Sequence, residues 1–130
     1  MLSKISTAAL AATLSLAASA AMAGAGDYAF EPVTPQMKKG EDVTLAVRLT
    51  NKQTGKPIPD AVIVKTRLDM APDGMAEMES AVAPLPSREP GVYAFKTDLP
   101  MAGRYQMTLS AKVQGEPETV TGKVIVTAVK

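Results

Sequence analysis

The chain has 130 residues, 14 of them basic and 13 acidic, and it contains no His, no Cys and no Trp. The missing residue types exclude conventional zinc, haem and iron–sulfur sites, disulfides, Ser-His-Asp triads and cysteine nucleophiles. A net charge of +1 provides no basic face for nucleic acid, and the shortage of acid–base and nucleophilic side chains argues against an enzyme.

The first 23 residues have the pattern of a secretory signal peptide. Residues 1–4 carry one positive charge, residues 5–21 are apolar or small, and Ala21-Met22-Ala23 supplies the small residues that a signal peptidase requires. Cleavage after Ala25 and retention as a membrane anchor are the alternatives, although the run is short for a span of roughly 20 residues. We therefore expect a signal peptide (1–23), one folded domain (24–130), a periplasmic location and no stable membrane insertion after signal cleavage.

Alternation of apolar and polar residues, which is the period of a half-buried strand, dominates the remaining sequence. In chain order the expected strands cover residues 28–33, 43–50, 62–70, 93–99, 104–113 and 120–128. The first is expected at a sheet edge, because Pro32 and Pro35 cannot donate ladder hydrogen bonds. Residues 71–91 form the one long stretch without alternation, and we expect them to be irregular.

Short strands separated by Gly- and Pro-containing turns are typical of an all-β, immunoglobulin-like antiparallel β-sandwich, here of about 6–7 strands. One set of alternate residues in each strand should face the core. In the strand at 62–70 the two sets are Val62, Val64, Thr66, Leu68 and Met70, expected inward, and Ile63, Lys65, Arg67 and Asp69. Gly103-Arg104-Tyr105 at a strand start resembles a tyrosine corner, in which the hydroxyl bonds to an upstream backbone group.

Residues 69–79 combine three methionines and four carboxylates without any basic residue. A thioether is a soft ligand that favours Cu(I), and because each neutral sulfur binds modestly, about three of them must converge. The expected metal ligands are Met70, Met75, Met78 and, from a following strand connection, Met101. The expected supporting carboxylates, which would attract cations, are Asp69, Asp73, Glu77 and Glu79. No catalytic residue and no cofactor other than Cu(I) is expected.

These residues also allow interpretations without a metal. Met70 and Met107 lie on faces expected to point inward, where methionine fills irregular gaps. An exposed methionine cluster can instead form an adaptable protein-binding surface. The carboxylates lack the ligand register of an EF-hand, and an aromatic cleft for glycoside hydrolysis is missing, so a solvated acidic loop is the alternative. Arg67 and Arg104 are expected to be surface charges on outward strand faces.

Three features resemble a known family. They are a strand ending in Asp69-Met70, the Met- and Pro-containing loop after it, and the motifs Glu89-Pro90-Gly91-Val92-Tyr93 and Leu99-Pro100-Met101-Ala102-Gly103-Arg104-Tyr105. Together they are similar to the YtkA-like domain, which is related to the FixH family of small envelope proteins. The resemblance implies an immunoglobulin-like sandwich in the bacterial envelope, associated with copper handling, heavy-metal efflux or assembly of haem–copper oxidases. Because this chain keeps Met but lacks His, Cu(I) is favoured over Cu(II).

We therefore predict an exported periplasmic binding protein, a Cu(I) or heavy-metal carrier or accessory that uses the Met-rich acidic loop. The alternative is a non-metal protein-interaction module, in which the same loop or an open sheet edge docks onto an envelope efflux or oxidase-assembly complex. Partners of this kind are expected, and nucleic acid is not. The two hypotheses differ in whether the methionine sulfurs converge.

Overall fold

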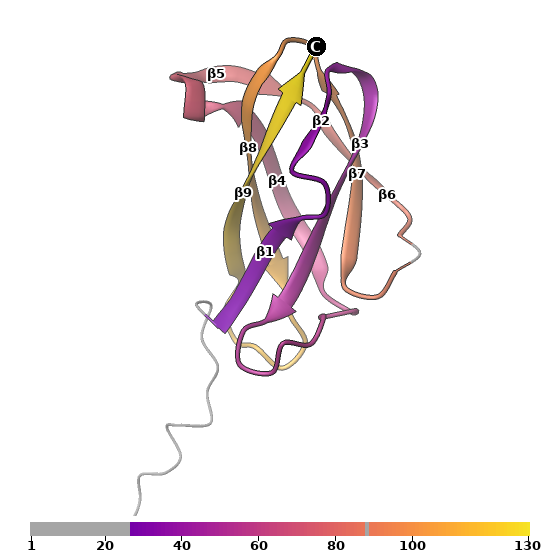
Figure 1. The fold of residues 1–130 in the computed structure, drawn as a ribbon. Helices are drawn as coiled ribbons and strands as arrows, with labels where there is room; N and C mark the ends of the chain where they lie inside the picture. The colour runs from indigo at the N-terminus through magenta and orange to yellow at the C-terminus, as the bar shows by residue number, and fades with distance from the viewer. Residues whose placement is uncertain (1–26, 88) are drawn as a thin grey trace, which may run out of the picture.

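The computed structural model describes residues 27–87 and 89–130, which form two packed β-sheets (Figure 1). The strands are β1 (Tyr28–Pro32), β2 (Gln36–Lys38), β3 (Gly40–Asn51), β4 (Val62–Met70), β5 (Met75–Ser80), β6 (Val82–Leu85), β7 (Val92–Leu99), β8 (Gly103–Lys112) and β9 (Val120–Val129), and the 3-10 helix η3 (Ala71–Asp73) joins β4 to β5. The expected signal peptide at 1–23 lies outside the described residues. In the part of the chain that is described, no helix has the length and hydropathy of a membrane span.

One sheet has the strand order β1-β3-β7-β6 and the other has the order β2-β9-β8-β4-β5. All pairs are antiparallel except the short parallel pair of β2 with β9. This arrangement is the two-sheet order of the immunoglobulin fold, with β5 added beside β4 and the short β2 added beside β9. The expected immunoglobulin-like β-sandwich is therefore confirmed, and β1 does lie at a sheet edge.

The core is built from the alternate residues that the sequence places on inward faces. The members buried in β3, β7, β8 and β9 are Leu45, Val47, Leu49, Phe95, Leu99, Tyr105, Met107, Leu109, Ala111, Val120, Val124, Val126 and Ala128. Burial of each Val, Leu or Phe side chain stabilises the fold by roughly 1.5–3 kcal/mol. These four strands agree with expectation because a period of two leaves one face of each strand apolar.

The two sheets approach closely where Phe30 of β1 lies over Gly122 of β9. A Cβ atom added at Gly122 would stand 2.3 Å from Cδ2 of the Phe30 ring. Real Cβ atoms do not approach other atoms this closely, so the ring and an alanine at this position would have to move apart. The glycine thus allows an edge strand of one sheet to pack against the other sheet.

The inward set expected for the first half of β4 is wrong. Val62 and Val64 are 59% and 48% exposed, whereas Ile63 packs against the core. The register with β8 shifts between Ile63 and Lys65, so Val64 has no partner residue. An extra residue of this kind is a β-bulge, and it reverses the alternation on one side of itself. Leu68 and Met70, beyond the bulge, are buried as expected.

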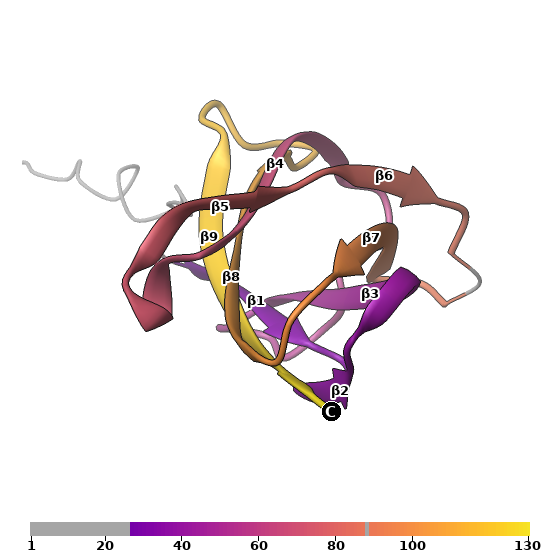
Figure 2. The same cartoon turned by 90° about the horizontal axis from the view of Figure 1, so that it is seen from above.

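The expectation that residues 71–91 are irregular is also wrong, because they contain η3, β5 and β6. β5 pairs with the end of β4, and β6 pairs with β7 in the other sheet. Figure 2 shows these two strands as one run of chain that passes from one sheet to the other. Each lies at a sheet edge and buries little surface, so neither has the strong apolar alternation that marks the inner strands.

Candidate functional site

Met70 and Met75 face each other at the end of the second sheet. Met70 is the last residue of β4 and Met75 the first of β5, and the two are register partners. Directly opposed residues of an antiparallel pair have Cβ atoms about 5 Å apart. Met70 is 1% exposed, and Met75 is partly buried against the same core cluster. The hairpin around η3 therefore brings these two methionines together from opposite sides of the Pro72-Asp73-Gly74 turn.

Met101 lies in the connection between β7 and β8, just before the strand start that the Met70 side chain reaches. The methyl carbon Cε of Met70 would stand 2.6 Å from a Cβ atom at Gly103, so the Met70 side chain reaches the start of β8. Met101 precedes Gly103 by two residues and is 39% exposed. Three of the four expected ligands, Met70, Met75 and Met101, thus come from three chain segments at one end of this sheet.

Tyr105 holds the Met101 connection in place. Its hydroxyl donates to the carbonyl oxygen of Met101 at 2.8 Å and accepts from the Met101 backbone N–H at 3.2 Å. The aromatic ring is buried in the core. This geometry confirms the tyrosine corner expected from the sequence, because the hydroxyl bonds to a backbone group four residues upstream.

Met78 is placed differently from the other three methionines. Asp69 pairs with Glu79 and the next residue of β4, Met70, pairs with Met75, so residues 76–78 bulge out of the β5 ladder. Met78 lies on this bulge and is 43% exposed. It therefore presents its thioether to solvent at the sheet edge, whereas Met70 points into the core.

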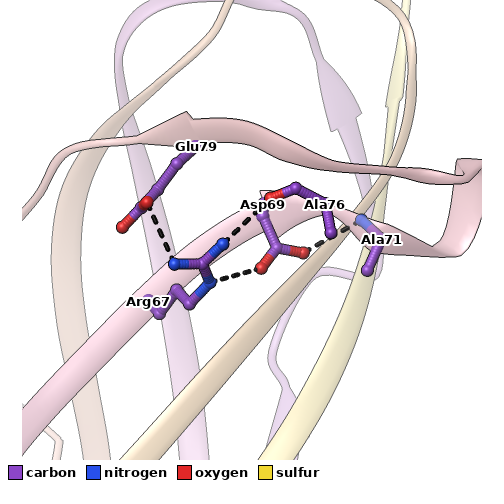
Figure 3. Close-up of polar contacts among 5 residues, drawn as sticks. All are labelled: Arg67, Asp69, Ala71, Ala76 and Glu79. Carbon is purple, nitrogen blue, oxygen red and sulfur yellow. Dashed lines mark hydrogen bonds and ion pairs between the residues drawn. The ribbon is translucent and has the colours of Figure 1, made fainter.

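Arg67 of β4 ties the bulge to the end of the strand (Figure 3). Its guanidinium donates from Nε to Asp69 at 2.7 Å, from Nη1 to Glu79 at 3.0 Å and from Nη2 to the Ala76 carbonyl oxygen at 2.9 Å. The other Asp69 oxygen accepts the Ala71 backbone N–H at 2.9 Å. The hydrogen bond to Asp69 and the charge of Glu79 raise the pKa of Arg67 further above its ordinary value.

Arg104 of β8 pairs with a third carboxylate, that of Asp73. Asp73 of η3 accepts the Arg104 backbone N–H at 2.8 Å and its Nε–H at 2.9 Å, and Arg104 Nη2 also donates to the Pro72 carbonyl oxygen at 2.7 Å. These two hydrogen bonds from Arg104 lower the pKa of Asp73 below its ordinary value of 3.8. The contact fixes η3 against the start of β8, and so fixes the turn between Met70 and Met75.

The two arginines change the electrostatics expected of the acidic segment. Asp69, Asp73 and Glu79 each pair with an arginine from a neighbouring part of the sheet. Glu77 makes no hydrogen bond or ion pair with any described residue. Nor does the described chain contain a group of three or more Asp or Glu placed to hold a metal ion. Two arginines against these four carboxylates leave the methionine end of the sheet with a net negative charge. Its potential metal donors outside ion pairs are the thioether sulfurs and Glu77.

The sequence interpretation placed Arg67 and Arg104 on outward faces as simple surface charges. It missed the ion pairs that both arginines make with the acidic segment. One signal was present, because Arg67 and Asp69 are two apart in a strand and so share a face. The Arg104–Asp73 contact joins residues 31 apart in sequence. It depends on how η3 packs against β8, which alternation does not specify.

The chain was compared with curated proteins, with solved structures and with models of protein families. A search of curated proteins found no significant match. Solved structures with a similar chain path include the adhesin InvE of Yersinia pseudotuberculosis, with 13% identity and a TM-score of 0.47 over 82% of this chain. This chain spans 27% of that adhesin. The ZirS C-terminal domain matches at 10% identity and a TM-score of 0.46, over 95% of this chain and 81% of that one. The Lin-41 filamin domain matches at 19% identity and a TM-score of 0.41, over 75% and 91% of the two chains.

The family comparison covers most of the sequence. The model of the YtkA-like family matches residues 22–110, from before β1 to a point near the end of β8. This range includes β4, η3 and β5, the β7–β8 connection, and all four expected methionine ligands. It also includes both arginines that pair with the acidic segment. The chain belongs to the YtkA-like family.

Proposed function

We propose that this protein is an exported periplasmic accessory that binds Cu(I) through methionine sulfurs at the β4–β5 end of the sandwich. The observation that carries the proposal is the placement of Met70, Met75 and Met101 at one end of the sheet, with Met70 reaching Gly103. About three thioethers are the minimum for a useful Cu(I) site, because each is a neutral ligand of modest strength. Membership of the YtkA-like family supports the proposal, since the resemblance to that family implies an association with copper handling.

The surroundings of the three methionines suit a soft monovalent ion. Arg67 and Arg104 engage Asp69, Glu79 and Asp73, so these carboxylates are not available as hard ligands. Carboxylate oxygens are the donors that Mg²⁺, Ca²⁺ and Mn²⁺ prefer, whereas thioethers select Cu(I). In the proposal, the exposed Met78 at the rim makes the first contact with the ion. The inner donors are then Met75 and Met101, with Met70 beneath them.

A binding role is proposed in preference to a catalytic one, because the chain has no His and no Cys. Those two side chains most often supply general bases and nucleophiles near neutral pH. The proposed periplasmic location follows from the signal-like residues 1–23. Neither nucleic acid nor a membrane is proposed as a partner, since the net charge is only +1.

An anaerobic competition titration with a Cu(I) chelator tests the proposal on the mature protein. We expect stoichiometric binding by the parent and at least tenfold weaker binding by a Met75→Leu/Met101→Leu variant. Leucine keeps the volume and apolar character, so the fold should remain intact. Met37→Leu, in β2, is the matched control and should bind as the parent does. No binding by the parent, or equal binding by the double variant, would overturn the proposal.

A second candidate function is a docking module for an envelope efflux or oxidase-assembly complex. It is favoured by the exposure of Met78 and Met101, because flexible thioether side chains make adaptable protein-binding surfaces. Substitution by leucine separates the two functions, since it keeps an apolar surface but removes the sulfurs. Docking is supported if a purified efflux or oxidase-assembly protein still binds the Met78→Leu/Met101→Leu variant but does not bind the Met78→Asp/Met101→Asp variant. Equal binding by parent and aspartate variant would exclude this surface.

A further inference from the structure

Half of β4 has no strand neighbour on its outer side. β5 pairs only with residues 68–70 of β4, at the end that carries the methionines. Residues 62–67, except Val64 at the bulge, pair with β8 on one side, and no other described strand pairs with them on the opposite side. Alternate backbone N–H and C=O groups along this edge are therefore open to another extended chain.

An apolar groove runs beside this open edge, between β4 and β6. Its main section has a volume of about 640 Å³, and its apolar lining includes Ala61, Val62, Ile63, Leu85, Tyr93 and Phe95. A second section of about 220 Å³ continues along Ile63, Val64, Lys65 and Thr66, with Pro84 and Phe95 opposite. Val62 and Val64 are the two most exposed large apolar residues of the described chain. The groove lies at the opposite end of β4 from the methionines.

Tyr93 fixes the end of the groove that lies beside the start of β4, here called its lower section. Its hydroxyl donates to the Ile58 carbonyl oxygen at 2.6 Å and accepts the Ala61 backbone N–H at 3.0 Å. On the same side, Gly91 packs so closely on Pro57 that an added Cβ would lie 2.4 Å from the proline Cβ. The connection before β4 and the turn before β7 therefore form one packed unit, and the groove exists before any ligand arrives.

Charge and backbone geometry limit what the groove can accept. Lys65 lines its upper section and makes no ion pair with a described residue, while Glu89 lines the lower section. The lysine and the bulge at Val64 are features that natural edge strands use against indiscriminate pairing. Pro84 removes one hydrogen-bond donor from the short strand β6, so the longer open edge of β4 offers a chain in the groove the more complete ladder. Both established neighbours of β4 are antiparallel to it.

From this juxtaposition we propose that the groove binds an extended segment of another protein as an antiparallel strand on the open edge of β4. Antiparallel pairing places the start of the segment beside Lys65 and its end beside Glu89. The complementary segment is therefore acidic at its start, alternates apolar residues towards the groove, and is basic at its end. This site is separate from the proposed Cu(I) site and does not depend on it.

The test uses the mature protein and a blocked synthetic peptide, Asp-Thr-Val-Thr-Val-Thr-Lys, with the reversed sequence as its partner control. Backbone NMR titration should show shifts concentrated at groove-lining residues in the ranges 61–66, 84–87 and 89–95. The Asp-first peptide should bind about tenfold more tightly than the Lys-first peptide, since two surface charge contacts change from attractive to repulsive. The same peptide, N-methylated at those alternate residues whose N–H groups would face β4, should not bind, because it cannot donate hydrogen bonds to that strand.

Charge-swapped protein makes the test sharper. The Lys65→Glu/Glu89→Lys variant should prefer the Lys-first peptide, whereas Lys123→Glu, on exposed β9 surface, should bind as the parent does. Thermal unfolding of each variant establishes that it is folded. Absence of binding by the parent, equal binding of both peptides, or full binding of the N-methylated peptide would overturn the proposal.

A second copy of the chain is the competing occupant. Sedimentation of the parent at high concentration reports it directly. Dimerisation that Val64→Lys abolishes, without peptide binding to the monomer, would show that the edge pairs with itself and would contradict the proposal. A monomeric parent that binds the Asp-first peptide at the β4 edge supports it.

Discussion

The hydroxyl of Tyr105 is the polar end of a side chain that is otherwise buried in the core. It satisfies both the N–H and the carbonyl of Met101, at the point where β7 turns into β8. Removing the Tyr105 hydroxyl leaves the N–H and the carbonyl of Met101 without their partners in a place that is partly buried. An unsatisfied buried polar group costs about 1–3 kcal/mol.

We therefore expect Tyr105→Phe to lower the free energy of unfolding by about 1–3 kcal/mol, measured by urea denaturation. Tyr28→Phe is the matched control, because Tyr28 donates a single, partly exposed hydrogen bond to Glu116. Its loss should cost less. Equal losses for the two variants would mean that the Met101 contact contributes nothing special. If Met101 is a copper ligand, Tyr105→Phe should also weaken Cu(I) binding.

Asp73 links two elements, since its carboxylate joins η3 to the first residues of β8. Arg104 lowers the pKa of Asp73 below 3.8 in the folded protein. A lowered folded-state pKa means that the carboxylate contributes stability above the unfolded value and loses this contribution as the pH falls through the folded value. The pair lies at the surface, so its contribution is small and weakens with salt.

The corresponding prediction concerns Asp73→Asn, which keeps an acceptor for the Arg104 N–H but removes the charge. The parent should be the more stable of the two at neutral pH. The difference should shrink as the pH falls below about 3.8 and vanish once Asp73 is protonated. Urea denaturation across this pH range measures it. A difference that persists unchanged in acid would show that charge is not the origin of the effect.

Contact between elements across the sandwich is most restrictive at Gly122. Gly122→Ala forces the Phe30 ring to move, because the two atoms would otherwise stand 2.3 Å apart. Overpacking of this kind costs typically 1–3 kcal/mol. We expect that loss in urea denaturation, and we expect a smaller loss for the same substitution in a Phe30→Leu background. Additive effects of the two substitutions would contradict direct contact between the side chains.

The inner strands could be predicted from the sequence because their period is uninterrupted, and the strands at 104–113 and 120–128 match β8 and β9 closely. The residues of β4 that face the core could not be predicted over the first half of the strand. The unpaired residue Val64 inverts the alternation there, and no feature of the sequence marks the bulge. β5 and β6 could not be predicted because edge strands bury little apolar surface and so lack strong alternation. The candidate methionines were found by residue type, but their relation to Arg67 and Arg104 depends on register and packing.

At the scale of the whole molecule, the core is much larger than the proposed metal site, with which it shares Met70 and the partly buried Met75. The core extends through both sheets and is made of Leu, Val, Phe, Tyr, Met and Ala side chains. The methionines lie at one end of one sheet, and the open edge of β4 lies at its other end. In the two proposals, the Cu(I) site and the strand-binding edge lie at opposite ends of β4, and we expect their ligands to bind independently.

This separation predicts how Cu(I) should affect stability. Protein treated with a Cu(I) chelator should remain folded and unfold in one cooperative transition, since a single core serves both sheets. Added Cu(I) should then raise the unfolding temperature by mass action, equivalent to about 2.7 kcal/mol at a free concentration 100 times the dissociation constant. Calorimetry measures both, and Met75→Leu/Met101→Leu should abolish the rise while leaving the chelated protein folded. A chelated parent that loses its cooperative transition would instead make the metal part of the fold, and an unchanged rise in the double variant would place the metal elsewhere.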